Sequence, residues 1–326
     1  MKQILSNKPI FLIVAGLSCN SACVMCSVKS HGKNCHNGTT KEIIKDLIKG
    51  RKENYERMEF TGGEPTIRKD IFLLIKQAQN LGYKEIGLNT NGILLGNKSF
   101  CEKLVKAGLT NITFSLHAHN KKLHEIITRT PDSFEQTVAG IKNALNYKNL
   151  TISVVTVILK LNYQHIFPIG KFIHSLGVSI WDITDLIPDG YGKESYKALC
   201  VKRIDLANTL NNLKPILDDF QTVTFFAFSP CLFPPNMINK KGFSLITALG
   251  KLEVEKPITY DQKNLPTDYV GKNFGTQQKK LDICQNCIFT EKCAGIWIEY
   301  LRLYGDEEIR KLAIKHGCIK RNFEFY

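Results

Sequence analysis

The sequence predicts an α/β fold: a partial (β/α)6 barrel of parallel strands, followed by a smaller cysteine-rich C-terminal domain. Three observations support this prediction. Six short β-like runs recur between residues 10 and 183, and each precedes a helix-like stretch or a loop leading to one. The cysteines gather in two groups, one near each end of the chain. After Pro230, proline and glycine become frequent and the periodicity weakens. Alternating strands and helices are typical of parallel sheets with helical crossovers, and a doubly wound sheet is the competing architecture.

The elements of the barrel follow one another in chain order. The β-like runs cover residues 10–17, 57–60, 85–88, 112–116, 151–159 and 178–183. A Thr39-x-x-Glu42 capping box opens the first helix, and Ser133-x-x-Gln136 resembles another that opens a helix through residue 146. Further helices are expected over residues 70–80, 100–107, 166–176 and 196–213, and a further strand over 223–228. We expect the barrel domain to span residues 1–215 and the cysteine-rich domain residues 216–326.

The composition is that of a globular protein with a basic surface. The chain has 326 residues, of which 43% are hydrophobic, enough to bury a full core. Its formal net charge of +14 would suit an acidic partner such as nucleic acid or an acidic peptide. The lysines are scattered, however, and no basic run is interleaved with aromatic residues. A nucleic-acid partner is therefore only weakly supported.

No stretch of the sequence is expected to cross a membrane. The apolar run at residues 10–17 precedes a cysteine, but it is only eight residues long and has no small-residue cleavage site before it. We expect a buried strand there, and a soluble, cytoplasmic protein. In such a compartment, clustered cysteines are more often metal ligands than disulfides.

The first cysteine group consists of Cys19, Cys23 and Cys26, with the spacing Cys-x3-Cys-x2-Cys. Three thiolates on one tight loop can bind three irons of a [4Fe–4S] cluster and leave the fourth iron open for a ligand. Structural zinc normally takes four ligands in paired spacings, and three cysteines on a polar loop are unusual in a core. The spacing therefore indicates an iron–sulfur site at the C-terminal end of the first strand.

This motif resembles the signature of the radical SAM superfamily, whose enzymes cleave S-adenosylmethionine (SAM) reductively to a 5′-deoxyadenosyl radical. The family usually has an aromatic residue before the third cysteine, where this chain has Met25. Polar motifs after the next three strands resemble the family's SAM-site elements, and the resemblance implies that they bind SAM. Their residues are Gly62, Gly63, Glu64, Asn89, Asn91, Ser115 and His117. Arg129 and Asn162 could face the same site or solvent, whereas His119 and His124 are expected at the surface.

The second cysteine group has the spacing Cys-x2-Cys-x5-Cys at Cys284, Cys287 and Cys293, with Cys231 upstream and Cys318 downstream. Any four of these five could complete an iron–sulfur or zinc site. We favour a second [4Fe–4S] cluster bound by Cys231, Cys284, Cys287 and Cys293. The segment resembles the SPASM and twitch auxiliary-cluster domains. The remaining cysteines are expected to be incidental thiols: Cys35, Cys101 and Cys200.

The resemblance implies an enzyme whose cofactors are SAM, its [4Fe–4S] cluster and the second cluster, with flavodoxin or ferredoxin as electron donor. Because such two-cluster enzymes often modify peptides or proteins, we expect a peptide or protein substrate first. No leader-binding domain precedes the first strand, which argues against a self-contained peptide maturase. Cofactor biosynthesis and RNA modification are the alternatives, and a non-enzymatic zinc or iron–sulfur protein is a further one. No residue is assigned to acid–base catalysis, because the cofactor performs the difficult step.

Overall fold

A computed structural model describes residues 10–30, 35–247, 250–251 and 277–319. Its main sheet has nine strands in the order β1 to β9, so each strand pairs with its neighbour in the sequence. All pairs from β1 to β8 are parallel, and only β9 is antiparallel to its neighbour. In the described residues β1 does not pair with β8 or β9, so the sheet is an open, partial barrel.

The strands of the main sheet are β1 (Ile10–Gly16), β2 (Arg57–Gly62), β3 (Glu85–Thr90), β4 (Asn111–Ser115), β5 (Thr151–Val157), β6 (Ile180–Thr184), β7 (Thr222–Phe226), β8 (Phe243–Thr247) and β9 (Gly250–Lys251). The helices up to β8 are α1 (Thr40–Lys52), α2 (Ile71–Asn80), α3 (Lys98–Ala107), α4 (Lys121–Thr128), α5 (Ser133–Leu145), α6 (Ile166–Ser175), α7 (Gly190–Glu194), α8 (Tyr196–Leu199), α9 (Arg203–Asn211), α10 (Lys214–Leu217) and α11 (Pro235–Ile238). The cysteine-rich part contains β10 (Gln278–Lys279), β11 (Ile296–Trp297), α12 (Ile298–Tyr304) and α13 (Glu307–Lys315).

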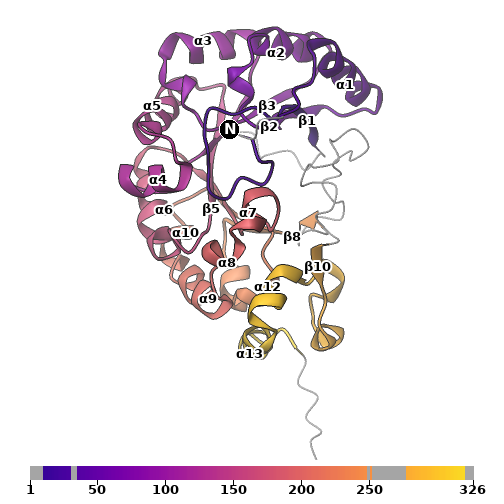
Figure 1. Ribbon diagram of the computed structural model, residues 1–326, viewed down its shortest axis with the longest axis vertical. Coiled ribbons are helices and arrows are strands. Elements are labelled where there is room, and N and C mark those ends of the chain that lie inside the picture. Colours follow the sequence, from indigo (N-terminus) through magenta and orange to yellow (C-terminus); the bar gives the residue numbers. More distant parts are fainter. Residues whose placement is uncertain (1–9, 31–34, 248–249, 252–276, 320–326) are drawn as a thin grey trace, which may run out of the picture.

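The helices between the strands pack on one side of the sheet, which leaves its other side to line a lumen. Crossovers between parallel strands are right-handed, so a sheet whose strands follow chain order keeps every crossover helix on the same face. Figure 1 shows α1 to α6 arranged in an arc outside the strands. The carboxyl ends of the strands then meet at one rim, where barrel enzymes place their active sites.

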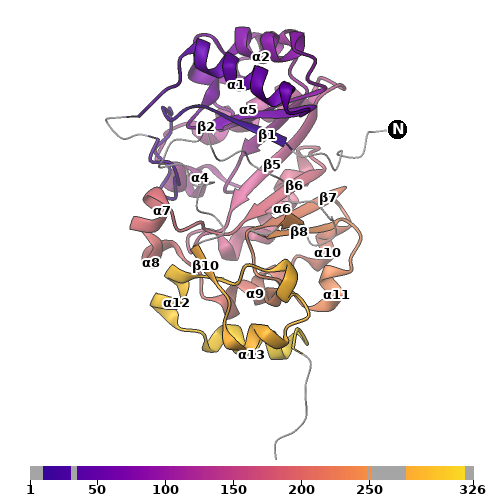
Figure 2. The same ribbon diagram turned by 90° about the vertical axis from the view of Figure 1, so that its right-hand side faces the viewer.

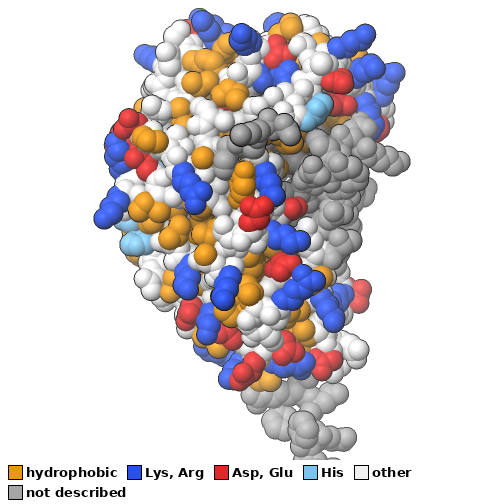
Figure 3. Space-filling model, viewed as in Figure 1, with side chains coloured by type: hydrophobic (Ala, Val, Ile, Leu, Met, Phe, Trp, Pro, Cys, Tyr) orange, Lys and Arg blue, Asp and Glu red, His pale blue; other side chains and the backbone are white. Residues whose placement is uncertain are grey.

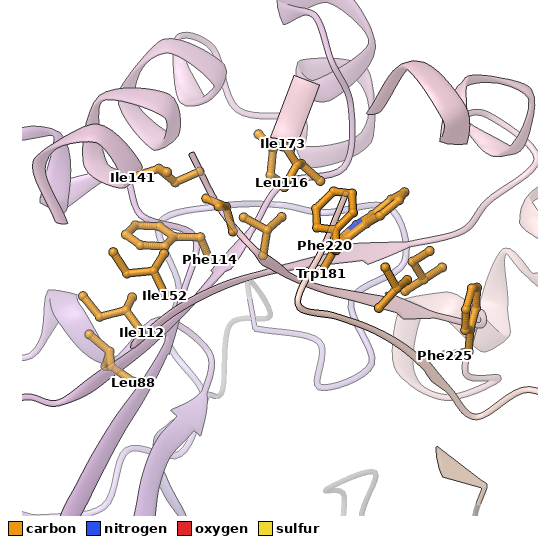
Figure 4. Close-up of a cluster of buried hydrophobic side chains, with 14 of the residues drawn as sticks. Leu88, Ile112, Phe114, Leu116, Ile141, Ile152, Ile173, Trp181, Phe220 and Phe225 are labelled. Carbon is orange, nitrogen blue, oxygen red and sulfur yellow. The ribbon is translucent and has the colours of Figure 1, made fainter. Parts of the chain in front are cut away.

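The hydrophobic core lies between the sheet and this arc of helices. Alternate strand residues point outward into it, as in β4, where Ile112 and Phe114 are buried and their neighbours are only partly covered. Figure 4 shows how side chains from several strands and helices fill this layer, among them Leu88, Ile141 and Trp181. The residues in between point into the lumen, and many of them are polar.

The predicted α/β architecture is confirmed, but the parallel sheet has eight strands instead of six. The strand expected at residues 223–228 is β7, and it pairs with β6 in the same sheet. The short strand β8 was not predicted, because it lies between a proline-rich turn and a segment with weak periodicity. The expected boundary at residue 215 therefore falls inside the sheet, before its last two parallel strands.

Two helix predictions were wrong in detail. The stretch at residues 196–213 is broken into α8 and α9, because Cys200 and Lys202 adopt extended backbone angles. The helix α5 begins at Ser133, but no side chain caps it. Ser133 is buried, and its hydroxyl pairs with Thr128 Oγ1 at 2.9 Å. The capping box of Thr39 and Glu42 on α1 is confirmed.

The cysteine-rich part packs against the barrel through a buried ionic network. Arg203 at the start of α9 makes two hydrogen bonds to the Asp185 carboxylate, at 3.0 and 2.8 Å. Trp297 Nε1 donates to the same carboxylate at 3.0 Å, and Tyr300 lies under the Arg203 guanidinium. Figure 2 shows α12 and α13 at the end of the molecule next to α9.

No helix in the described ranges combines the length and the apolar character needed to cross a bilayer.

Candidate functional site

The loop that follows β1 carries Cys19, Cys23 and Cys26, at the rim formed by the carboxyl ends of the strands. All three are free, partly buried thiols. Backbone amides point at two of the sulfurs, because Ser21 N donates to Cys19 Sγ at 3.3 Å and Ser30 N donates to Cys26 Sγ at 3.4 Å. Such N–H···S bonds are typical of thiolates that ligate iron.

The electrostatics of these thiols fit a metal cluster. Burial raises the pKa of Cys19 to about 12, and Glu64 and Cys26 raise it further by their charge. Burial also raises the pKa of Cys23 to about 12, with added repulsion from Cys19 and Cys26. Without a metal Cys19 and Cys23 would therefore stay neutral near pH 7, and a cluster bound between them would supply the positive charge that ionises them. The donor set therefore fits three corners of a [4Fe–4S] cluster.

The cluster loop is held by two helices that the sequence did not connect with it. Ala22 and Val24 donate their backbone N–H groups to the carbonyls of Thr128 and Ile127 at the end of α4, at 3.1 and 2.9 Å. Tyr191 on α7 donates its backbone N–H to Cys26 O at 2.8 Å. The Asp-Gly-Tyr-Gly segment at residues 189–192 is the sequence feature that could have indicated this contact with the cluster loop.

Gly62 and Gly63 allow the end of β2 to touch this loop. A Cβ at Gly63 would lie 2.2 Å from Ser18 O, and one at Gly62 would lie 2.2 Å from Gly16 O. Gly62 also has a φ of +123°, which side chains rarely adopt. The resemblance implies that these glycines bind SAM, and the structure shows that they also let two backbones approach each other. Both glycines still line the cavity described below.

Glu64 is buried at the junction of β2 and β3, and both carboxylate oxygens accept hydrogen bonds. Oε1 accepts from Thr66 N at 3.0 Å, Thr66 Oγ1 at 2.6 Å and Thr90 Oγ1 at 2.8 Å. Oε2 accepts from Asn91 N at 2.6 Å. Burial raises the pKa of Glu64, whereas these four donors lower it by favouring the ionised form. Glu64 thus fixes the turns after two neighbouring strands.

The two asparagines of β3 and its following turn have different surroundings. Asn91 Nδ2 donates to Asn20 Oδ1 at 2.7 Å and lies 3.9 Å from Cys19 Sγ, so it contacts the cluster loop. Asn89 points into the lumen, where its Nδ2 donates to Glu59. The sequence placed both at one ligand site, and both line the cavity described below, with Asn89 about 7 Å deeper along the strand than Asn91.

Ser115 and His117 lie at the end of β4 and both line the cavity. His117 is buried, and its Nδ1 accepts from Val157 N at 3.3 Å. Its ring stacks on His124, with the centroids 5.9 Å apart. Burial lowers the pKa of His117 to about 3 and that of His124 to about 4, so both rings are neutral near pH 7. The expectation that His124 is a surface residue was wrong, because it faces the core side of α4.

A cavity of about 480 Å³ joins these residues. It is lined by the three cysteines, by Gly62, Gly63, Glu64, Asn89, Asn91, Ser115 and His117, and by lumen residues of β2 to β8. Asn162 does not face it, because its side chain is buried in hydrogen bonds to Leu159 N, His117 O and Val157 O. Arg129 is exposed and ends α4 with a φ of +51°.

The second cysteine group is also assembled, and it includes Cys318. Cys231, Cys284, Cys287 and Cys293 line one small cavity between the turn after β7, β11 and α13. Burial raises the pKa of Cys231, and the charges of the other four cysteines raise it further. Cys318 is buried beside them, and its carbonyl accepts from Ile288 N at 2.8 Å. Five thiols therefore converge on one site.

Comparison with known families finds one match along the chain. Residues 13–173 match the model of the radical SAM superfamily. A curated relative from Saccharolobus solfataricus, named "Probable GTP 3',8-cyclase", is 30% identical over 180 residues. This match covers 55% of the present chain and 58% of the relative, so it spans little more than half of either protein.

Solved structures resemble this fold over a longer stretch. SuiB from Streptococcus suis, bound to its precursor peptide SuiA, aligns with a TM-score of 0.60 at 17% identity and covers 92% of this chain and 74% of its own. The enzyme anSMEcpe, with bound AdoMet and a peptide, aligns with a TM-score of 0.61 at 15% identity and covers 94% of this chain and 97% of its own. At these identities the likeness establishes the fold.

Proposed function

Because residues 13–173 belong to the radical SAM superfamily, we propose that this protein is a radical SAM enzyme that modifies a peptide or protein. The observation that carries the proposal is the loop of Cys19, Cys23 and Cys26 on the rim of an open lumen. When bound there, the [4Fe–4S] cluster and SAM supply a 5′-deoxyadenosyl radical that abstracts a hydrogen atom from the substrate. The residues of the chain position the reactants and exclude water.

The residues around the cluster loop suit the polar groups of SAM. The amino group would be received by the carbonyls of the Gly62-Gly63 turn and by the negative potential of Glu64, whose orientation four hydrogen bonds fix. Asn91, Ser115 and the neutral ring of His117 line the rest of the same wall. They offer hydrogen bonds to the carboxylate and the ribose hydroxyl groups.

We assign the second cysteine group to an auxiliary [4Fe–4S] cluster. Five candidate thiols at one site exceed the four ligands of tetrahedral zinc, and the Cys-x2-Cys-x5-Cys spacing resembles auxiliary-cluster domains. Four ligands would come from Cys231, Cys284, Cys287, Cys293 and Cys318, and iron analysis of the reconstituted protein should give about eight irons per chain.

The charge of the lumen favours a peptide over a nucleotide. Glu59, Glu64 and Asp182 line it, and none of its described lining residues is Lys or Arg. A nucleoside triphosphate would therefore bring about four negative charges into an acidic cavity. The described basic residues lie outside this lining, and Figure 3 shows those on the face in view dispersed among acidic ones. This dispersion also gives no support to an RNA-binding face.

A second candidate is a GTP 3′,8-cyclase, favoured by the 30% identity with the Saccharolobus relative. Incubation of the reconstituted protein with GTP, SAM and dithionite discriminates the two candidates. We expect no GTP consumption above a control without protein. GTP-dependent 5′-deoxyadenosine formation, together with a cyclised nucleotide, would establish the second candidate and exclude the first.

The radical SAM activity itself is tested by 5′-deoxyadenosine release from SAM under anaerobic reduction. We expect release by the wild-type protein, with flavodoxin, ferredoxin or dithionite as electron donor. Cys26→Ala should abolish it, because one corner of the cluster loses its ligand. Cys35→Ala is the matched control on the same loop and should retain it. Zinc alone in the purified protein, with no nucleoside released, would refute the proposal.

A further inference from the structure

The lumen of the barrel contains a belt of polar side chains, of which only Asn89 belongs to the motifs assigned to SAM. Six successive strands, β2 to β7, each contribute one member. The belt consists of Glu59, Asn89, Thr113, Ser153, Asp182 and Thr224. The strand register pairs Asn89 with Thr113, Thr113 with Ser153, and Asp182 with Thr224. These side chains therefore form an arc across the open sheet, with an offset of two residues at Glu59 and at Asp182.

Hydrogen bonds join the members of this polar belt. Asn89 donates its Nδ2 to Glu59. The hydroxyls of Thr113 and Ser153 are 2.9 Å apart. The hydroxyls of Ser153 and Thr224 both hydrogen-bond to the Asp182 carboxylate. The Asp182 carboxylate is thus held from both neighbouring strands, and the Glu59 carboxylate from β3.

The depth of the belt separates it from the cluster loop. Glu59 precedes the end of β2 by three residues, which is about 10 Å along a strand. Asp182 precedes the end of β6 by two residues, or about 7 Å. A substrate group that reaches this level would lie below the rim that carries the cysteines.

A polar belt at this depth of the lumen is unusual for a barrel. Barrel interiors are normally filled by bulky branched side chains, which leave a packed core. In this protein the side chains of the polar belt are short or acidic. They leave a cavity of about 480 Å³ that extends to the cysteine loop at the rim. Glu59 and Asp182 are only partly covered and face this cavity, so their carboxylates are accessible to a cationic ligand that enters it.

No cation of the described lining balances the two carboxylates. Burial raises the pKa of Glu59 to about 7, and the charge of Asp182 raises it further. Burial likewise raises the pKa of Asp182 to about 6. Arg57 on the same strand lowers the pKa of Glu59, but its Nε donates to Glu85 at 2.6 Å and it does not line the cavity. The site therefore has negative charge and unused acceptor capacity.

We propose that Glu59 and Asp182 determine substrate choice by binding an ammonium or guanidinium group, carried by a Lys or Arg side chain of a peptide that enters the lumen. The inference rests on the proposed peptide-modifying function and names the chemical group that the enzyme recognises. An ammonium group offers three donors and a guanidinium five, and each can bridge two carboxylates. Anchoring that side chain would hold the neighbouring backbone and side chains near the cluster loop.

The test compares charged and neutral side chains of similar shape. Heptapeptides with randomised flanks and a central Lys, norleucine, Arg or citrulline are dialysed against the reconstituted holoprotein with SAM, and the bound fraction is quantified by mass spectrometry. We expect Lys and Arg peptides to be enriched at least about ten-fold over norleucine and citrulline, since one charge-assisted contact is worth that much. Equal retention of charged and neutral peptides would overturn the proposal.

Isosteric variants assign the preference to the two carboxylates. Glu59→Gln and Asp182→Asn keep the side-chain volume and should each reduce the enrichment to about two-fold or less. Glu56→Gln is the matched control, because Glu56 lies just before the same strand and pairs with Lys84 outside the lumen at 2.7 Å. An enrichment that persists in both carboxamide variants would contradict the proposal, as would a loss of SAM affinity in place of peptide affinity.

The pH dependence follows from the raised pKa values. Ionised carboxylates bind cations, so the enrichment should increase between pH 5.5 and pH 8 as Glu59 and Asp182 deprotonate. A flat profile would contradict the assignment. GTP is included in the same dialysis, and its retention in preference to the peptides would also overturn it. Because 5′-deoxyadenosine release is measured on the same preparation, failure of this inference remains distinguishable from failure of the proposed function.

Discussion

Gly63 illustrates at the scale of one residue how the site depends on close backbone contact. Its amide donates to Gly16 O at 2.8 Å, and the next amide, that of Glu64, donates to Ser18 O at 2.8 Å. These bonds join the end of β2 to the start of the cluster loop. A side chain at Gly63 would meet the carbonyls of Ser18 and Leu17 at 2.2 and 2.5 Å, which are backbone atoms that cannot rotate away.

Gly63→Ala should therefore displace the cluster loop. We expect 5′-deoxyadenosine formation to fall at least about ten-fold, because small misplacements at a reacting centre have large effects on rate. Gly38→Ala is the control, since a Cβ there would make only an ordinary contact of 3.5 Å with Ile43. If both variants cleave SAM at the wild-type rate, Gly63 does not position the loop as described.

At the scale of elements, the sequence predicted what depends on local pattern and missed what depends on contacts between distant segments. The first six strands and the capping box of α1 follow from periodicity and capping chemistry, and they are confirmed. The short strand β8 was missed because only its pairing with β7 makes it a strand. The support of the cluster loop by α4 and α7 was missed because these helices are more than 90 residues away from it in the sequence.

The candidate site shows the same division. The cysteine spacing predicted both groups of thiols, and the structure brings each group together. The lumen position of Asn89 follows from strand alternation and could have been predicted from it. The partner of Asn89, Glu59, could not, since nothing local distinguishes a carboxylate on the lumen side from one on a solvated face. The burial of His124 depends likewise on tertiary packing.

The network of Asp185, Arg203 and Trp297 should be essential for docking the cysteine-rich part on the barrel. Arg203→Met removes the partner of a buried carboxylate and should lower the free energy of unfolding by about 3–5 kcal/mol. Anaerobic urea unfolding of the holoprotein measures this change. Lys311→Met removes an exposed ion pair with Glu307 on α13 and should have no measurable effect. Equal urea midpoints for Arg203→Met and wild type would contradict this role.

At the scale of the whole molecule, one open parallel sheet places all the reactive groups at its carboxyl rim. The cluster loop follows β1, the turns proposed to bind SAM follow β2 to β4, and the second cysteine group includes Cys231 in the turn after β7. The polar belt lies deeper in the same lumen. The fold thus orders the proposed components along one axis, from the cluster at the rim to substrate recognition below it.

The most direct test of this account is the electron paramagnetic resonance spectrum of the anaerobically purified, reduced protein with and without SAM. The account predicts a [4Fe–4S]+ signal that requires Cys19, Cys23 and Cys26 and that changes shape when SAM is added, because one iron has no cysteine ligand. A spectrum that does not change with SAM, or a signal that survives alanine substitution of all three cysteines, would contradict it.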